Sequence, residues 1–210
     1  MMEIRRGILL NDGLFMPPGY QRIEWLESDG TPYIDSGIEC TSDLIVEFDY
    51  MWISRSSTNT GICGGMSSAN SPMILRHTCN PYYGYYMMYA SSTSGRIAVF
   101  AVANNTRCVC MVNPVTGLAK INGTSAVFTP VPSGYTTGKG YGIFARINEN
   151  GEKFSNIQSR FYSVKFYRNG KQIGNFVPCI RKSDSTPGMY NTIAHDFRTN
   201  AGTGTFTVPV

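Results

Sequence analysis

Short apolar runs, in which every second residue is polar, recur along the sequence and end at turn signals. In residues 45–50 the apolar Val46, Phe48 and Tyr50 alternate with Glu47 and Asp49. A period of two is typical of a β-strand with one buried face. No longer window keeps the period of an amphipathic helix, so we predict an all-β chain.

Asn-Gly pairs stand between several of these runs, and this dipeptide is the strongest short signal of a β-hairpin. We therefore predict a hairpin over residues 160–176, turning at Asn169-Gly170. The expected strands are residues 22–27, 31–38, 44–53, 61–66, 73–78, 82–89, 96–102, 107–112, 118–121, 126–128, 141–147, 161–167, 172–177 and 205–208, with Phe197 in a further one. So many short strands favour a two-sheet antiparallel sandwich over a barrel.

Residues 1–19 differ from the rest because they show no alternation and end in Pro17-Pro18-Gly19. We interpret them as an extended N-terminal arm or anchoring peptide, followed by one domain over residues 20–210. The side chains expected to anchor the arm are Ile4, Arg5, Arg6, Ile8, Leu9, Leu10 and Phe15.

Charge is sparse but segregated along the chain. The net charge of +4 is mild, so we expect no nucleic-acid partner. Residues 20–49 carry one arginine against eight acidic residues, and residues 139–182 carry nine basic residues against two glutamates. A basic patch for an anionic partner is one interpretation. We favour the other, in which early and late strands are neighbours and their opposite charges pair.

The six cysteines form no Cys-x-x-Cys pair and there are only two histidines, so we expect no metal site and no cofactor. The apolar run at residues 8–10 is too short for a signal-peptide core, and no stretch is long enough to insert into a membrane. We expect synthesis in a reducing cytoplasm, with the cysteines as buried small hydrophobes. Cys108 and Cys110 should then face the same side of a strand.

Several stretches resemble one family. Residues 24–38 (EWLESDGTPYIDSGI), 143–146 (IFAR), 159–176 and 188–206 resemble the ordered motifs of concanavalin A-like (laminin G-like) jelly-roll domains, which occur in proteins of gut bacteria and their phages. Residues 1–6 resemble the short Met/Arg-rich openings of Bacteroides-phage proteins. The resemblance implies a two-sheet jelly roll, and glycan binding is common in this architecture.

This resemblance leads us to expect a non-enzymatic bacteriophage virion protein: a capsid decoration, head fibre or tail-associated adhesin. It would assemble in the cytoplasm of the bacterial host, contact other virion proteins through the arm, form a homo-oligomer and have a host-surface glycan as its candidate ligand. The alternative is a carbohydrate-binding module at the bacterial cell surface or secreted from it.

The segment 76–89 has the richest supply of groups that bind sugars, which are flat aromatic faces flanked by polar donors. On a strand, Tyr83 and Tyr85 share one face, while Tyr82 and Tyr86 share the other. An oligomer interface remains open as the alternative, since tyrosine and methionine are enriched there. The candidate glycan or partner contacts are Trp52, Arg76, His77, Tyr82, Tyr83, Tyr85, Tyr86 and Tyr89, while we expect Trp25 in the core.

Catalysis has little support in the sequence. Glu47 and Asp49 share a strand face, as paired carboxylates of glycosidases do, but Met51 stands where those strands carry a second Glu. We interpret them as solvent-facing acids and expect no catalytic residue. Calcium, which binds many laminin G-like domains, needs several clustered oxygens, and residues 50–138 contain no Asp or Glu.

Overall fold

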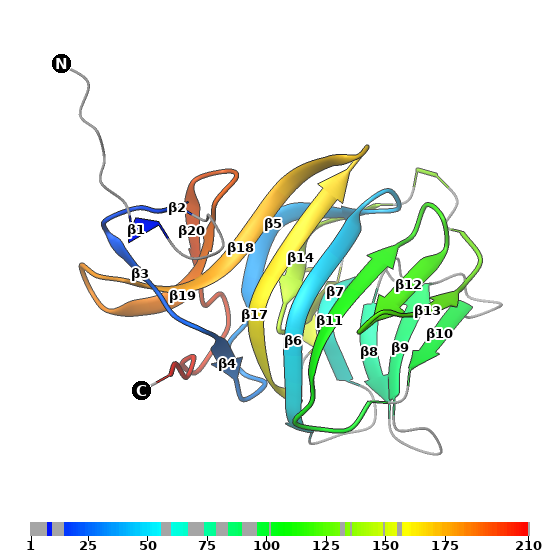
Figure 1. Ribbon diagram of the computed structural model, residues 1–210, viewed down its shortest axis with the longest axis horizontal. Helices are drawn as coiled ribbons and strands as arrows, with labels where there is room; N and C mark the ends of the chain where they lie inside the picture. The colour runs from blue at the N-terminus through cyan, green and yellow to red at the C-terminus, as the bar shows by residue number, and fades with distance from the viewer. Residues whose placement is uncertain are drawn as a thin grey trace.

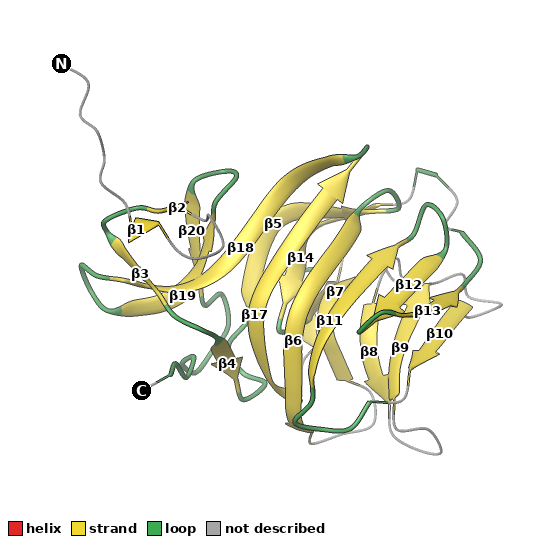
Figure 2. Cartoon of the chain, in the orientation of Figure 1, coloured by secondary structure: helices red, strands yellow, loops and turns green. Residues whose placement is uncertain are grey.

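Strands from distant parts of the chain pair into two mostly antiparallel sheets that stack face to face (Figure 1). The computed structural model describes residues 8–9, 15–55, 60–66, 74–78, 84–89, 96–100, 102–130, 133–134, 136–148, 150–154 and 157–209. Over these residues the chain forms strands and loops, as Figure 2 shows. None of these residues forms a helix that could span a membrane. The prediction of an all-β sandwich is confirmed, and the arrangement is compatible with a jelly roll.

The ten-stranded sheet is centred on the pair β6 (Ile45–Arg55) and β17 (Ile157–Arg168). The strands beyond β6 are β11 (Arg107–Asn113), β12 (Leu118–Ile121) and β13 (Thr124–Val127). Those beyond β17 are β18 (Lys171–Arg181), β19 (Thr186–Asn191) and β20 (Asp196–Thr199). Two short early strands complete it: β3 (Tyr20–Arg22) on β18 and β4 (Leu26–Ser28) on β17.

The eight-stranded sheet lies behind the ten-stranded one in Figure 1. Its main strands are, in order, β10 (Arg96–Phe100), β9 (Gly84–Tyr89), β8 (Ile74–Thr78), β7 (Thr60–Met66), β14 (Thr136–Ile143) and β5 (Ile34–Thr41). The short β15 (Arg146–Asn148) runs parallel to β7 and pairs with β16 (Lys153–Phe154). Separately, β1 (Ile8–Leu9) pairs with β2 (Phe15–Met16).

The predicted hairpin is confirmed, because β17 and β18 are joined at Asn169 and Gly170, whose φ angles are 52° and 72°. Four expectations were wrong. Residues 141–147 are not one strand, since β14 ends at Ile143 and β15 begins at Arg146. Residues 22–27 are not one strand, since β3 and β4 pair with different neighbours. Residues 205–208 make only an isolated bridge, from Thr207 to Glu27. The strand β19 was not expected, since its Pro187-Gly188 hides the strand pattern.

Aromatic rings from both sheets form the core between them. On the ten-stranded sheet, the ring centroids of Tyr50 and Phe161 are 5.6 Å apart. From the other layer, Phe144 lies 4.7 Å from Phe161 and Tyr141 lies 5.2 Å from Phe166, both edge to face. Aromatic pairs in these geometries add to the stabilisation from burial, so the rings fix how one sheet sits on the other.

The acidic and basic segments are neighbours in the ten-stranded sheet, as we favoured from the sequence. The β6 strand pairs with β17 along most of its length. Arg160 and Glu27 form an ion pair of 2.5 Å, and Arg168 lies 3.4 Å from Asp43. Gln158 also donates to Glu27, at 2.7 Å. The opposite charges therefore stabilise strand pairing, and this pairing accounts for the segregation seen in the sequence.

A second apolar cluster lies on the outward side of the ten-stranded sheet. Met16, Val177, Cys179 and Tyr190 are buried there. The ring of Tyr20 covers them, 4.8 Å from Tyr190. Packing of the domain therefore begins at Met16, within the segment that we interpreted as the arm.

The described cysteines are buried and form no disulfide, in agreement with the sequence interpretation: Cys40, Cys63, Cys108, Cys110 and Cys179. Cys108 and Cys110 do face the same side of β11. Burial raises the pKa of Cys40 and of Cys63 to about 12, so both stay as unreactive thiols at neutral pH. Cys79 lies outside the described residues.

We predict that Met16→Ala lowers the free energy of unfolding by about 2–3 kcal/mol, because it opens a cavity in the second cluster. Met16 is 5% exposed. Urea unfolding measures the change, with Gln21→Ala at an exposed position of β3 as the control. Equal stability of the two variants would show that the domain does not depend on this segment.

We predict that Arg160→Met costs roughly 3 kcal/mol of stability, because it leaves the carboxylate of Glu27 buried without its cation. The side chains of Arg160 and Glu27 are 31% and 9% exposed. The control is Arg181→Met, which removes the exposed ion pair with Asp184 and should change stability little. Similar losses in both variants would contradict the prediction.

Candidate functional site

The tyrosine-rich segment lies in the eight-stranded sheet, where β9 is placed between β8 and β10. The backbone register puts Arg76 opposite Tyr86, His77 opposite Tyr85, and Tyr89 opposite Arg96. Tyr82 and Tyr83 lie outside the described residues. The proposed glycan or partner contacts of this segment stay predictions.

The two tryptophans are placed the other way round from what we expected. Trp52 is 5% exposed and packs in the core, so its ring is not on the surface to stack on a ligand. The parity of β6 explains this, because Val46, Phe48, Tyr50 and Trp52 all point inward. Trp25, expected in the core, is instead half-buried, with the guanidinium of Arg160 4.0 Å from its ring centroid.

The proposed anchoring residues fall at the start of the chain. Ile8 and Leu9 form β1, and Leu9 is opposite Phe15 in β2. Ile4, Arg5, Arg6 and Leu10 lie outside the described residues. Their anchoring role stays a prediction.

A cavity of about 500 Å³ opens on the outward face of the ten-stranded sheet, and we call it the outer pocket. It forms where β17 changes neighbour, pairing with β4 up to Phe161 and with β18 from Val164 onward. The residues that line it are Arg22, Glu24, Asp49, Arg107, Tyr162, Ser163, Lys165, Tyr167, Gln172, Asn175 and Val177.

A register shift in β17 helps to form this lining. Phe161 pairs with Tyr50 and Ser163 pairs with Asp49, so Tyr162 is an extra residue between them. Both Tyr162 and Ser163 line the outer pocket. Such irregularities re-aim side chains and often lie next to binding sites.

Arg107 is held firmly at one wall of the outer pocket. Its Nε and Nη2 each donate to a different oxygen of Asp49, both at 2.8 Å. The guanidinium lies 3.7 Å from the ring centroid of Tyr162 and 3.9 Å from Glu24. The hydrogen bonds that Arg107 donates to Asp49 raise the pKa of Arg107 further. This bidentate pair fixes the cation over the tyrosine ring.

Tyr167 and Glu47 form a second polar pair. The hydroxyl of Tyr167 donates to Glu47 Oε2 at 3.1 Å. Burial and the nearby negative charge of Glu47 raise the pKa of Tyr167 to about 12. Tyr167 is therefore a neutral donor at physiological pH, and its hydrogen is already committed to Glu47.

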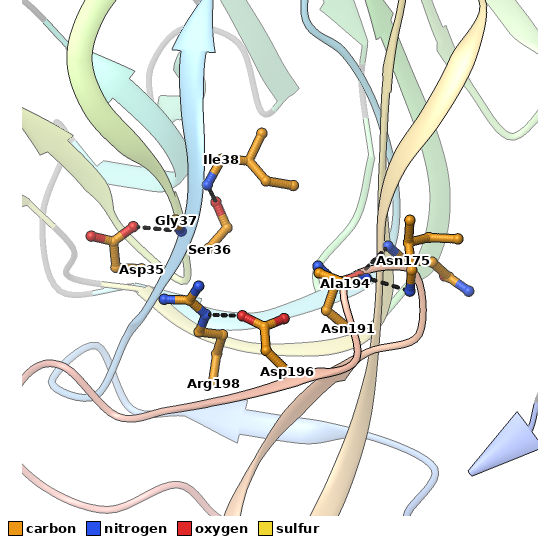
Figure 3. Close-up of polar contacts among 10 residues, drawn as sticks. Asp35, Ser36, Gly37, Ile38, Asn175, Asn191, Ala194, Asp196 and Arg198 are labelled. Carbon is orange, nitrogen blue, oxygen red and sulfur yellow. Dashed lines mark hydrogen bonds and ion pairs between the residues drawn. The ribbon is translucent and has the colours of Figure 1, made fainter. Parts of the chain in front are cut away.

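Asn175 is the most buried polar residue of the lining, at 5% exposure. Its backbone N–H donates to Asn191 Oδ1 at 3.1 Å, and its side-chain Nδ2 donates to Thr192 Oγ1 at 2.9 Å. Figure 3 shows Asn175 of β18 beside Asn191 at the end of β19. Its Oδ1 has no hydrogen-bond partner among the described residues. A buried acceptor without a donor is costly, and such groups often mark a binding position.

The carboxylates of Asp49 and Glu47 on this face accept hydrogen bonds from side chains of the protein itself. Among the described residues, no group of three or more His, Cys, Asp or Glu side chains is placed to hold a metal ion. Sequence reasoning singled out Glu47 and Asp49 but missed Lys165, Tyr167 and Asn175. The alternation of β17 marks Lys165 and Tyr167 as outward, whereas Asn175 lies in a fully buried run, residues 174–179.

We predict that Glu47→Gln lowers the pKa of Tyr167 from about 12 toward the ordinary value of 10.0, because the negative charge that opposes phenolate formation is removed. Ultraviolet absorbance titration of the variant, with Tyr167→Phe to identify the signal, measures the change. An unaltered titration would show that burial alone raises this pKa.

No protein-family model matches the chain, and no curated protein matches it in sequence.

Proposed function

We propose that the protein is a non-enzymatic, carbohydrate-binding component of a bacteriophage particle and that the outer pocket holds the glycan. The observation that supports glycan binding is the lining, which combines tyrosine rings with amide, hydroxyl and ammonium groups. Sugars need this combination of flat faces and hydrogen-bonding groups. The volume of about 500 Å³ suits one or a few sugar rings.

Binding is favoured over hydrolysis by what the two carboxylates contact. Glycoside hydrolysis needs one carboxylic acid and a second carboxylate, both facing the scissile bond. Both oxygens of Asp49 accept hydrogen bonds from Arg107, and Glu47 accepts one from Tyr167. These contacts support a structural role for both acids, which hold their neighbours in place around the outer pocket.

The virion setting rests on the resemblance of residues 20–210 to jelly-roll domains of phages and gut bacteria. Buried free thiols fit assembly in a reducing cytoplasm. Contacts of the arm with other virion proteins and self-association through the tyrosine-rich strands belong to the same proposal. The alternative, a surface or secreted binding module, predicts oxidised cysteines, so thiol titration of the unfolded native material distinguishes the two.

The pocket is tested by filling it. Ser163 lines the outer pocket and its side chain makes no hydrogen bond to any described residue, so Ser163→Trp should occupy the cavity without breaking a polar contact. On an array of neutral and acidic glycans we expect wild-type binding to at least one sugar and at least tenfold weaker binding by Ser163→Trp.

The matched control is Ser125→Trp, at an exposed position of β13 outside the outer pocket. It should bind as the wild type does. If the wild type binds no glycan, the carbohydrate proposal is wrong. If both variants bind equally well, the glycan binds elsewhere on the domain.

A further inference from the structure

Two neighbouring side chains of the outer pocket, a cation and a hydrogen-bond acceptor, together indicate which chemical class of ligand fits there. Lys165 of β17 and Asn175 of β18 are directly opposite in the strand register, and both line the cavity. Tyr167 and Gln172, which are opposite each other two residues further along β17, also line the cavity. Side chains in such cross-strand pairs start about 5 Å apart, so Lys165 and Asn175 reach the same small ligand group.

Lys165 stands out among the cations of the lining. Arg107 is paired with Asp49 and lies near Glu24. By contrast, no carboxylate of the described residues lies within ion-pair distance of the Lys165 ammonium. Glu47 is opposite Lys165 on the β6 side, but it accepts a hydrogen bond from the hydroxyl of Tyr167. On the β18 side the neighbours, Asn175 and Gln172, are uncharged, so an anionic group is free to approach from there.

Asn175, unlike Lys165, needs a hydrogen-bond donor from the ligand. Its buried Oδ1 lacks a donor among the described residues, whereas a donor on the ligand would satisfy it. A ligand that fits both side chains therefore carries an anionic oxygen for Lys165 next to a hydroxyl for Asn175. A hexuronic acid at the non-reducing end of a saccharide has this pattern, because the carboxylate on its C5 is adjacent to its free C4 hydroxyl.

We propose that the outer pocket binds acidic saccharides, with the carboxylate on Lys165 and the adjacent hydroxyl on Asn175. This inference rests on the proposed carbohydrate function and names its ligand class. Lys165 determines specificity for the acid, since a charge-assisted hydrogen bond is roughly twice as strong as a neutral one.

The experiment compares uronic acid oligosaccharides with their carboxyl-reduced counterparts, which carry a neutral hydroxymethyl group in place of each carboxylate. Immobilised pairs of glucuronate, galacturonate, mannuronate and guluronate oligomers serve as probes, in the presence of a chelator. We expect at least one acid to bind on the order of tenfold more tightly than its neutral counterpart, with a preference that weakens as salt is added.

Lys165→Gln should abolish this preference while leaving the weaker neutral binding unchanged. Asn175→Asp, which keeps the acceptor and adds a negative charge, should weaken acid binding most. Lys120→Gln, on β12 and outside the outer pocket, is the charge-matched control and should behave as the wild type.

The outcomes separate this inference from the proposed function. Equal binding of acids and reduced counterparts would overturn the acid assignment and leave carbohydrate binding standing. An acid preference that persists in Lys165→Gln would overturn the assignment to Lys165. Binding of no saccharide at all, acidic or neutral, would overturn both.

Discussion

Pairing of β6 with β17 is the contact on which the rest of this protein depends. More than a hundred residues separate these strands in sequence, yet they are neighbours from Ile45 and Tyr167 at one end to Arg55 and Ile157 at the other. Their inward faces carry the aromatic side chains that join the two sheets, and their outward faces carry complementary charge. All other strands of the ten-stranded sheet are added to this pair, so an error in its register would turn core rings outward and charges inward.

The outer pocket follows from the same pairing. A continuous flat sheet would leave no cavity, but β17 exchanges β4 for β18 along its length and carries an extra residue at Tyr162. One wall includes Val177, whose side chain also belongs to the cluster that Met16 covers. The segment that we interpreted as the arm thus supports the wall of the outer pocket indirectly, which links a feature of packing to the geometry of the candidate site.

Local patterns in the sequence were sufficient for much of the fold. Alternation located β6 and β17, and Asn169-Gly170 located the turn between β17 and β18, because both signals arise from the strand itself. The same alternation also places Trp52 inward, so the error there came from weighing residue type above parity. The role of Asn175 could not be predicted from the sequence, because β18 is buried on both faces at this residue. Only the tertiary structure shows which of its polar atoms has a partner.

The distribution of hydrogen bonds on the outward face is the physical reason why we propose binding rather than catalysis. Asp49 and Glu47, the carboxylates that catalysis would need, have donors within the protein, whereas Asn175 Oδ1, an acceptor, and Lys165, a cation, have no partner among the described residues. A catalytic face would show the reverse, with free carboxylates facing the cavity. Fixed acids hold Arg107 and Tyr167 in defined positions, and rigid side chains around a preformed cavity reduce the entropy lost when a ligand binds. These contacts are the basis of our proposal that the outward face holds a polar molecule in one orientation rather than transforming it.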